Sequence, residues 1–382
     1  MSLTKATAAG IYVHVPFCKS KCIYCDFVSY PKQEHCFEAY SVAVCRELQL
    51  QANRLAGTKI LSVYFGGGTP SLLSSGQLGR ILRTITQNYR LTDDCEISLE
   101  CNPGTMTEQK AKDFARLGIN RCSVGLQTSN TSILRTLNRP HNRRDFETTI
   151  EALRLAGISN LNADIMLGLP GQTEKDVAET LRLLCDLNLP HVSAYALKVE
   201  PRTPLSKAVK EGKLKLPSED LQVDWYDLTV QTLAQHGLKR YEVSNFAKEG
   251  YECLHNLNYW RWGRYLGVGV NASSFLGDTR YRNVTSPEKY MQRVEEGKIP
   301  VSEQHRISLA EAEIEYIMLH LRLNEGMSVE DFNRRFACDF CKKYEEVLKK
   351  LDKIGVLEHT CDRLRVKQDR MYVLNSILVE FL

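Results

Sequence analysis

Six short apolar runs rich in β-branched residues recur over the first 200 residues, and helical patterns separate them. The runs are IYVHV (11–15), LSVYF (61–65), CEISLE (95–100), RCSVGL (121–126), LNADIML (161–167) and HVSAYAL (191–197). Helices are expected over about 36–55, 75–89, from Thr107, over about 129–156 and over about 174–187. Strands that alternate with helices predict a parallel sheet with right-handed crossovers. Six such units favour a partial (β/α)6 barrel of the TIM-like kind over a closed eight-unit barrel.

The pattern changes after about residue 300. Residues 201–300 are less regular and are rich in aromatic residues around 241–265. Amphipathic helices are then expected over 307–323, over 328–336 with Ser328 as N-cap, and over about 339–353, followed by a β-ribbon in 357–375. The sequence therefore predicts an α/β fold, with a partial barrel over 1–300 and an α+β winged-helix-like domain over 301–382.

Composition narrows the class of protein. Of the 382 residues, 43% are hydrophobic and 25% are charged, which is typical of a globular protein with a sizeable core. No apolar run reaches the roughly 18 residues of a membrane span, and the N-terminus has no apolar signal core, so we expect a cytoplasmic protein. The thirteen cysteines are then expected to be thiols or metal ligands. A net charge of +4 is too mild to predict a nucleic-acid partner.

Three cysteines lie close together on the loop after the first predicted strand. In HVPFCKSKCIYCDF, Cys18, Cys22 and Cys25 have the spacing Cys-x3-Cys-x2-Cys. Thiolates bind soft metal ions and iron–sulfur clusters. A zinc site usually adds a fourth cysteine or histidine at a compact spacing, and His14 and His35 leave that alternative open. Three thiolates on a four-iron cubane would leave one iron free to take a small chelating molecule.

Other polar and glycine-rich signatures fall at the ends of the next predicted strands. GGGTPS follows the second strand, Glu100 ends the third, Gln127 follows the fourth with Arg139 further along, and Asp164 lies within the fifth. In barrels of parallel strands, the loops after the carboxyl ends of the strands carry the active residues. Each signature alone also has a structural interpretation as a turn, a cap or a surface charge. Together they predict one ligand-binding rim.

These motifs resemble those of the radical S-adenosylmethionine (SAM) proteins, whose signature is the Cys-x3-Cys-x2-Cys loop. The resemblance implies a 4Fe-4S cluster on Cys18, Cys22 and Cys25, with the methionine part of SAM on the open iron. The residues that the resemblance places around SAM are Tyr12, Tyr24, Gly67, Gly68, Thr69, Glu100, Gln127, Arg139 and Asp164. For Tyr12 and Tyr24, a purely structural role in the core or the loop is the alternative.

A second segment narrows the resemblance. YEVSNFAKEGYECLHNLNYWRWGRYLGVG (241–269) resembles the coproporphyrinogen dehydrogenase group and, within it, the heme-chaperone members. The resemblance covers essentially the whole chain and implies a protein that binds heme, with His255 as a candidate ligand, and delivers it to recipient hemoproteins. A hydrogen-bonded structural histidine is the alternative. Phe27 stands where the oxygen-independent coproporphyrinogen III oxidase has a fourth cysteine, and only 17 residues precede Cys18.

Three other functions are alternatives to heme delivery. The first is that oxidase, a radical SAM enzyme that takes an electron from a flavodoxin- or ferredoxin-like donor and decarboxylates porphyrinogen propionates. The second is a non-catalytic protein with a structural zinc site. The third is DNA binding by the C-terminal winged-helix-like part, and the mixed charges of that part argue against it. Cys338 and Cys341 form a second Cys-x2-Cys pair and are interpreted as ordinary thiols. Contact with a membrane is expected only peripherally, through the recipients of heme.

Overall fold

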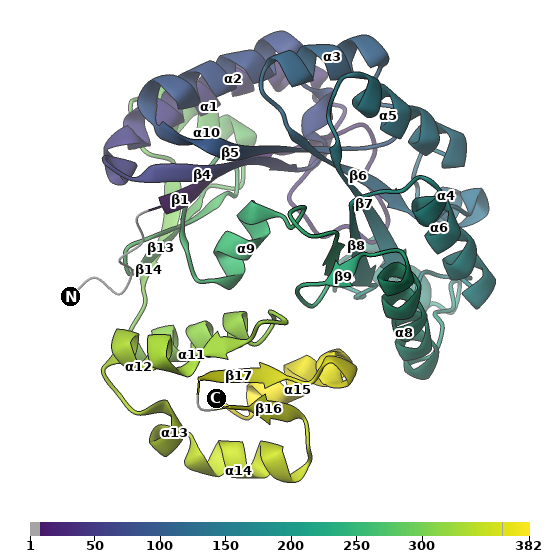
Figure 1. Ribbon diagram of the computed structural model, residues 1–382. Helices are drawn as coiled ribbons and strands as arrows, with labels where there is room; N and C mark the ends of the chain where they lie inside the picture. Colours follow the sequence, from purple (N-terminus) through teal and green to yellow (C-terminus); the bar gives the residue numbers. More distant parts are fainter. Residues whose placement is uncertain (1–7, 361) are drawn as a thin grey trace.

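A twelve-stranded curved sheet dominates the computed structural model, which describes residues 8–360 and 362–382 (Figure 1). Its central strands run parallel in the order β11 (Arg264–Val268), β1 (Ala8–Val15), β4 (Lys59–Gly67), β5 (Arg90–Cys101), β6 (Arg121–Gln127), β7 (Asn160–Leu167) and β8 (His191–Ala196). Beside β8 lie β10 (Asn245–Ala247) and β9 (Lys239–Arg240), and beside β11 lie β12 (Ser273–Leu276), β13 (Thr279–Asn283) and β14 (Val301–Arg306). All six predicted strands are present, and β11 adds a seventh parallel strand next to β1 that was not predicted.

Helices cover the convex face of this sheet (Figure 1). They are α1 (Phe37–Gln51), α2 (Ser75–Asn88), α3 (Glu108–Arg116), α4 (Thr131–Thr136), α5 (Arg143–Leu155), α6 (Glu174–Asp186) and α8 (Glu219–Gln235). The predicted helices are confirmed, and the helical segments expected over about 129–156 are α4 and α5. The smaller elements of this part are β2 (Phe17–Cys18), β3 (Tyr30–Pro31), α7 (Pro204–Lys210) and α10 (Pro287–Glu295). One helix, α9 (Leu254–Trp260), lies on the concave side instead.

The two faces of the strands differ in polarity. Val63, Leu99 and Val124 belong to the apolar core and are fully buried. Their neighbours Glu100 and Ser123 line an internal cavity. Because successive side chains of a strand point to opposite faces, this alternation sends apolar groups to the helices and polar groups to the barrel interior.

The crossover helices begin at side chains that cap their first turn. Ser74, Asn142 and Thr173 each accept a hydrogen bond from the backbone amide three residues ahead, and the side chain of that residue accepts one from the backbone amide of the cap. Such capping boxes satisfy amide groups that have no partner inside the helix. The short loops that carry the polar rim are therefore fixed at their helical ends.

The C-terminal part forms a smaller α+β unit below the concave side of the sheet (Figure 1). It contains α11 (Leu309–His320), β15 (Met327–Ser328), α12 (Val329–Phe336), α13 (Phe340–Lys343), α14 (Glu345–Lys353), β16 (Leu357–His359), β17 (Arg363–Val366) and α15 (Leu374–Val379), with sheet order β15-β17-β16. Ser328 caps α12 as predicted, accepting from the Asp331 amide at 3.2 Å.

Two expectations for this part were wrong in detail. The third helix divides at Tyr344, and the ribbon ends at Val366 because residues 368–379 are helical. Leu374, Ile377 and Leu378 are buried at helical spacing, a signal that the ribbon prediction overlooked. The core of this unit includes Trp262 from the preceding region, so it packs against the barrel, and a domain boundary near residue 300 stays a prediction.

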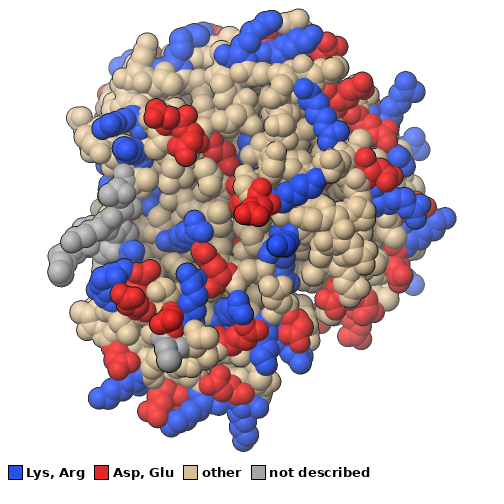
Figure 2. Space-filling view, viewed as in Figure 1, with Lys and Arg blue, Asp and Glu red and all other residues tan. Residues whose placement is uncertain are grey.

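Positive and negative side chains are interspersed over the surface. Figure 2 shows Lys and Arg beside Asp and Glu over most of the face in view, above all over the C-terminal unit. Within residues 8–360 and 362–382, no helix has both the length and the apolar character needed to cross a membrane.

A buried carboxylate joins several elements at the β11 edge of the barrel. Glu47 of α1 is fully buried and accepts hydrogen bonds from the Gly269 amide at 2.8 Å, the Asn283 amide group at 2.8 Å and the Tyr290 hydroxyl at 2.6 Å. Burial raises the pKa of Glu47 to about 7, although these hydrogen bonds oppose the shift. The protonated form is therefore favoured in the folded protein below that pH.

Replacing Glu47 with glutamine should remove one source of pH dependence. Because the folded-state pKa lies above the unfolded value, the contribution of Glu47 to stability is complete below pH 4.5 and is lost as the pH rises through about 7. Wild type should thus lose about 3 kcal/mol relative to Glu47→Gln over that interval, measured by urea unfolding across pH. The exposed Glu38→Gln variant is the control, and parallel curves for wild type and Glu47→Gln would contradict the prediction.

Candidate functional site

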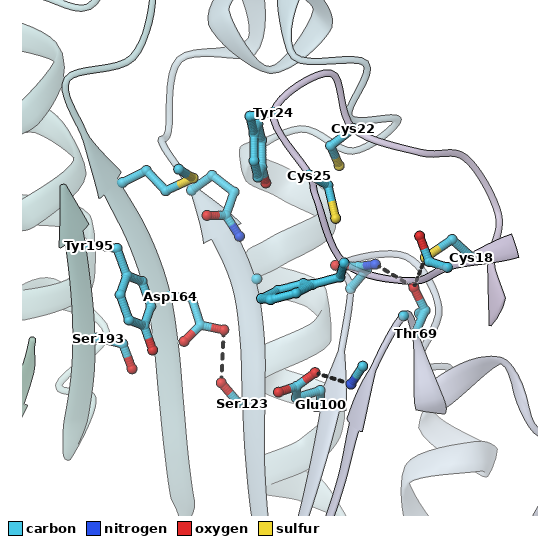
Figure 3. A pocket seen from close by; sticks show the side chains of 18 of the residues that line it. Cys18, Cys22, Tyr24, Cys25, Thr69, Glu100, Ser123, Asp164, Ser193 and Tyr195 are labelled. Carbon is cyan, nitrogen blue, oxygen red and sulfur yellow. Dashed lines mark hydrogen bonds between the residues drawn. The ribbon is translucent and has the colours of Figure 1, made fainter. Parts of the chain in front are cut away.

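A cavity of about 460 Å³ opens at the carboxyl ends of the parallel strands. Most of the predicted site residues line it: Cys18, Cys22, Tyr24, Cys25, Gly67, Gly68, Thr69, Glu100, Gln127, Arg139 and Asp164. Figure 3 shows the three cysteines on one loop at one side and the carboxylates of Glu100 and Asp164 on the strands below them. The structure therefore brings eleven residues from six segments of the chain into one chamber.

The cysteine loop is held by the turn between α4 and α5. The Ile23 amide donates to the Leu137 carbonyl at 3.2 Å, and the Asn138 side chain donates to the Lys21 carbonyl at 2.8 Å. A small apolar cluster beneath the loop includes Ile23, Leu137 and Leu169. These contacts fix the three sulfurs toward the cavity although the loop has little regular structure of its own.

Donors with partial or full positive charge surround the cysteines. The Arg139 guanidinium lies 3.8 Å from Cys22 Sγ, and the Thr69 hydroxyl donates to Cys18 Sγ at 3.8 Å. Burial raises the pKa of the Cys18 and Cys25 thiols, and deprotonation there needs a positive charge nearby. Arg139 supplies one such charge, and its own position is set by bonds to the Gly125 carbonyl at 2.8 Å and the Asn102 side chain at 3.0 Å.

The glycines after β4 are required by packing as well as by the cavity. A Cβ on Gly67, whose φ is +113°, would lie 2.5 Å from the His14 ring. A Cβ on Gly68 would lie 2.4 Å from the Phe17 carbonyl oxygen. Glycine lets this backbone run against the base of the cysteine loop while still facing the cavity.

Two carboxylates face the cavity from β5 and β7, the strands on either side of β6. Glu100 accepts from the Tyr64 hydroxyl at 2.9 Å and from the Gly67 amide at 3.1 Å, and burial raises its pKa to about 7. Asp164 accepts from the Ser123 hydroxyl at 2.9 Å and the Asn162 side chain at 2.7 Å, and burial raises its pKa too. These oxygens have lone pairs left, so each carboxylate can still accept a hydrogen bond from a ligand hydroxyl or ammonium group.

Tyr12 and His255 do not line this cavity. Tyr12 bonds to His14 Nδ1 at 2.9 Å and lines a neighbouring cavity of about 350 Å³. His255 is 1% exposed, and its ring nitrogens are 2.8 Å from the Ser62 and Tyr259 hydroxyls. Ligation of heme by His255 stays a prediction, and it would require breaking at least one of these hydrogen bonds in a densely packed place.

Phe27, at the position of the absent fourth cysteine, borders both cavities. Its side chain is 64% exposed, although large apolar side chains are usually buried. Several aromatic rings line the second cavity, among them Tyr259 of α9 and Tyr265 of β11. The exposed ring of Phe27 thus lines both cavities.

Several cavity residues were missed from the sequence. They are Tyr64, Asn102, Arg121, Ser123, Asn162, Ser193, Tyr195 and Asn256. Most occupy alternate positions of the strands, and the polar residues within RCSVGL, LNADIML and HVSAYAL carry that signal. Polar residues at every second position of otherwise buried parallel strands indicate a polar interior, because such strands are usually apolar on both faces.

The donor set fits an iron–sulfur cluster with a chelating ligand. Three cysteines on one loop can hold a cubane and leave one iron without a protein ligand. Beyond them the cavity offers Arg139 for a carboxylate, and Glu100 and Asp164 for amino or hydroxyl groups. Among the described residues, no group of three or more His, Cys, Asp or Glu is placed to hold a metal ion.

Two segments of the chain match known families. Residues 12–184 match the radical SAM superfamily, and residues 307–369 match the HemN C-terminal domain. The first match contains the cysteine loop and the strands that carry Glu100 and Asp164. The second covers most of the unit below the barrel.

Relatives named "Heme chaperone HemW" match nearly the whole chain. The protein from Lactococcus lactis subsp. lactis (strain IL1403) is 34% identical over 97% of this chain and 96% of its own length. The Bacillus subtilis (strain 168) protein is 31% identical over 97% and 98%, and the Escherichia coli (strain K12) protein is 30% identical over 100% of both chains.

A solved structure establishes the fold. Coproporphyrinogen III oxidase (HemN) from Escherichia coli, described as a radical SAM enzyme, aligns with a TM-score of 0.86 over 99% of this chain and 91% of its own, at 24% identity. The predicted combination of an α/β barrel with a C-terminal domain is confirmed by this likeness. A shared fold does not by itself carry a shared activity.

Proposed function

This chain belongs to the HemW family of radical SAM proteins, and on that premise we propose that it is a heme chaperone, which binds heme and delivers it to hemoproteins. The observation that carries the proposal is the agreement of relatives of that name with nearly the full length of the chain, at 30–34% identity in three bacteria. The agreement includes both the barrel and the C-terminal unit. A 4Fe-4S cluster liganded by SAM is the second part of the proposal.

The residues around the main cavity support the second part. Cys18, Cys22 and Cys25 would hold the cluster, and Arg139 would orient the SAM carboxylate. Glu100 and Asp164 would accept from its amino and ribose hydroxyl groups. A cluster and SAM bound there would supply one-electron redox chemistry. The buried walls of the cavity would keep water away from that pair.

Hemin titration tests the chaperone. Wild-type protein, reconstituted anaerobically, should bind hemin saturably, with a change in the Soret absorbance that reports a protein ligand to iron. If His255 is that ligand, His255→Ala should lose the change, and if the ligand lies elsewhere the change should persist. Absence of saturable binding in wild type would contradict the proposal. Protoporphyrinogen formed from coproporphyrinogen III in the same preparation would favour the oxidase instead.

Replacing Asp164 with asparagine tests the SAM site. Asparagine keeps the size of the side chain but loses the charge that a ribose hydroxyl would meet, and a hydrogen bond to a charged group contributes about 1.5–3 kcal/mol. We therefore expect SAM affinity to fall by about 10- to 100-fold in isothermal titration. Asp113→Asn on the outer helix α3 is the control. Equal affinities for wild type and Asp164→Asn would place the SAM ribose elsewhere.

A further inference from the structure

A buried arginine lines the main cavity beyond the residues that the proposed SAM site uses. Arg121 is the first residue of β6 and is 2% exposed. Its Nε atom is buried without a hydrogen-bond partner, and the Glu96 carboxylate lies 3.9 Å away, beyond hydrogen-bond distance. A buried guanidinium with an unfilled donor is costly, and such groups are normally paired.

Glu96 is engaged by other donors. It accepts from the Leu254 amide at 3.0 Å, the His255 amide at 3.4 Å and the Ser98 hydroxyl at 3.0 Å. Its charge is therefore directed at the first turn of α9, and Arg121 is left as the incompletely bonded cation of the pair. Glu100 and Asp164, which line the cavity from the strands, have hydrogen-bond donors of their own, described above.

The depth of Arg121 separates it from the rim. Ser123 of β6 pairs with Glu100 of β5, and Arg121 precedes Ser123 by two residues. At the usual rise of a strand, Arg121 begins about 7 Å further into the barrel than Glu100. Asn256 of α9 lines the same cavity from the concave side. A guanidinium and an amide of this kind match the two oxygens of a carboxylate.

We propose that Arg121 and Asn256 form a carboxylate receptor at the inner end of the cavity. The ligand group is a carboxylate on a flexible arm, because the arm has to carry the carboxylate inward from the rim to meet the Arg121 guanidinium. This step rests on the proposed function: in a tetrapyrrole chaperone, the group that fits is a propionate side chain. A free small carboxylate has the same chemistry, and the experiment separates the two sources.

The first arm of the experiment uses simple ligands and full-length protein. Sodium propionate should raise the thermal unfolding midpoint of wild type by more than equal concentrations of propionamide or sodium chloride. Arg121→Lys keeps the charge beside Glu96 but loses the planar fork, and Asn256→Leu keeps the volume but loses the amide. Both should lose the propionate increment, whereas Arg116→Lys on α3, an exposed ion-paired arginine, should keep it. Equal responses of wild type to propionate and propionamide would overturn the receptor.

The second arm compares hemin with hemin dimethyl ester. Wild type should bind the ester at least about tenfold more weakly, and the ratio should approach one in Arg121→Lys and Asn256→Leu. Hemin binding without a propionate increment or ester discrimination overturns this inference and leaves the chaperone standing. If propionate raises the unfolding midpoint but hemin does not bind, the receptor binds a free carboxylate and the proposed chaperone function is wrong. If propionate raises the unfolding midpoint but hemin and its ester bind equally well, the carboxylate that the receptor binds does not belong to a tetrapyrrole.

Discussion

Replacing any one of Cys18, Cys22 or Cys25 with serine is expected to abolish the iron–sulfur cluster, the largest effect that this chain should show. All three sulfurs come from one loop and face one cavity, so the remaining pair cannot surround a cubane. Iron and sulfide content and visible absorbance after anaerobic reconstitution measure the outcome. SAM affinity should fall with the cluster, because the open iron is one of its expected ligands.

Two other cysteines serve as matched controls for that loss. Cys36 lies just after the loop and donates to the Gln33 side chain, and Cys338 lies in the C-terminal unit. Serine at either position should leave the cluster intact. Full cluster content in a Cys18, Cys22 or Cys25 variant would contradict the assignment. If wild-type protein holds zinc without iron or sulfide, the three cysteines bind zinc instead of a cluster.

Replacing Glu96 with alanine is expected to lower the free energy of unfolding by about 3–5 kcal/mol, because it leaves Arg121 buried without its counter-charge. The same change removes the acceptor for the first amides of α9, so hemin binding should weaken if α9 helps to form the heme site. Urea unfolding measures the first effect and hemin titration the second.

The exposed carboxylate Glu38 provides the comparison. It forms an ion pair with Arg80 on the outer surface, and Glu38→Ala should change stability little because water screens such pairs. A loss below about 1 kcal/mol for Glu96→Ala would show that other groups compensate Arg121. In that case, the interior of the barrel would hold water or an ion close to this arginine.

The β/α units were predictable because their signals are local. Runs such as LSVYF and RCSVGL alternate with amphipathic helices, and residues such as Thr173 mark where a helix begins. Parallel pairing then brings the carboxyl ends of the strands together, so the rim could be predicted from the position of each motif along its own strand. Eleven of the predicted SAM and cluster residues line the cavity, Cys18 and Cys22 among them.

The misses arise where distant segments meet. β11 pairs with β1 across some 250 residues, and no local pattern marks a strand as the neighbour of another so far away. For His255, a candidate heme ligand by its motif, only the fold shows that its ring nitrogens lie 2.8 Å from the Ser62 and Tyr259 hydroxyls, and its role in heme binding stays a prediction. Nothing in the sequence around Arg121 marks it as a cavity residue, and only the barrel places it in the cavity wall.

The amino-acid sequence alone determined the strand and helix succession, the cysteine loop and the residues that face one rim, because periodicity, capping and loop position are encoded within short stretches. Only the tertiary structure decided which polar groups find partners. Burial and long-range packing satisfied His255 and Glu47 with hydrogen bonds and left Arg121 incompletely bonded in the cavity wall. The hydrogen-bond partners of a buried polar group come from distant parts of the chain that the fold brings together. They could therefore not be predicted from the sequence around that group.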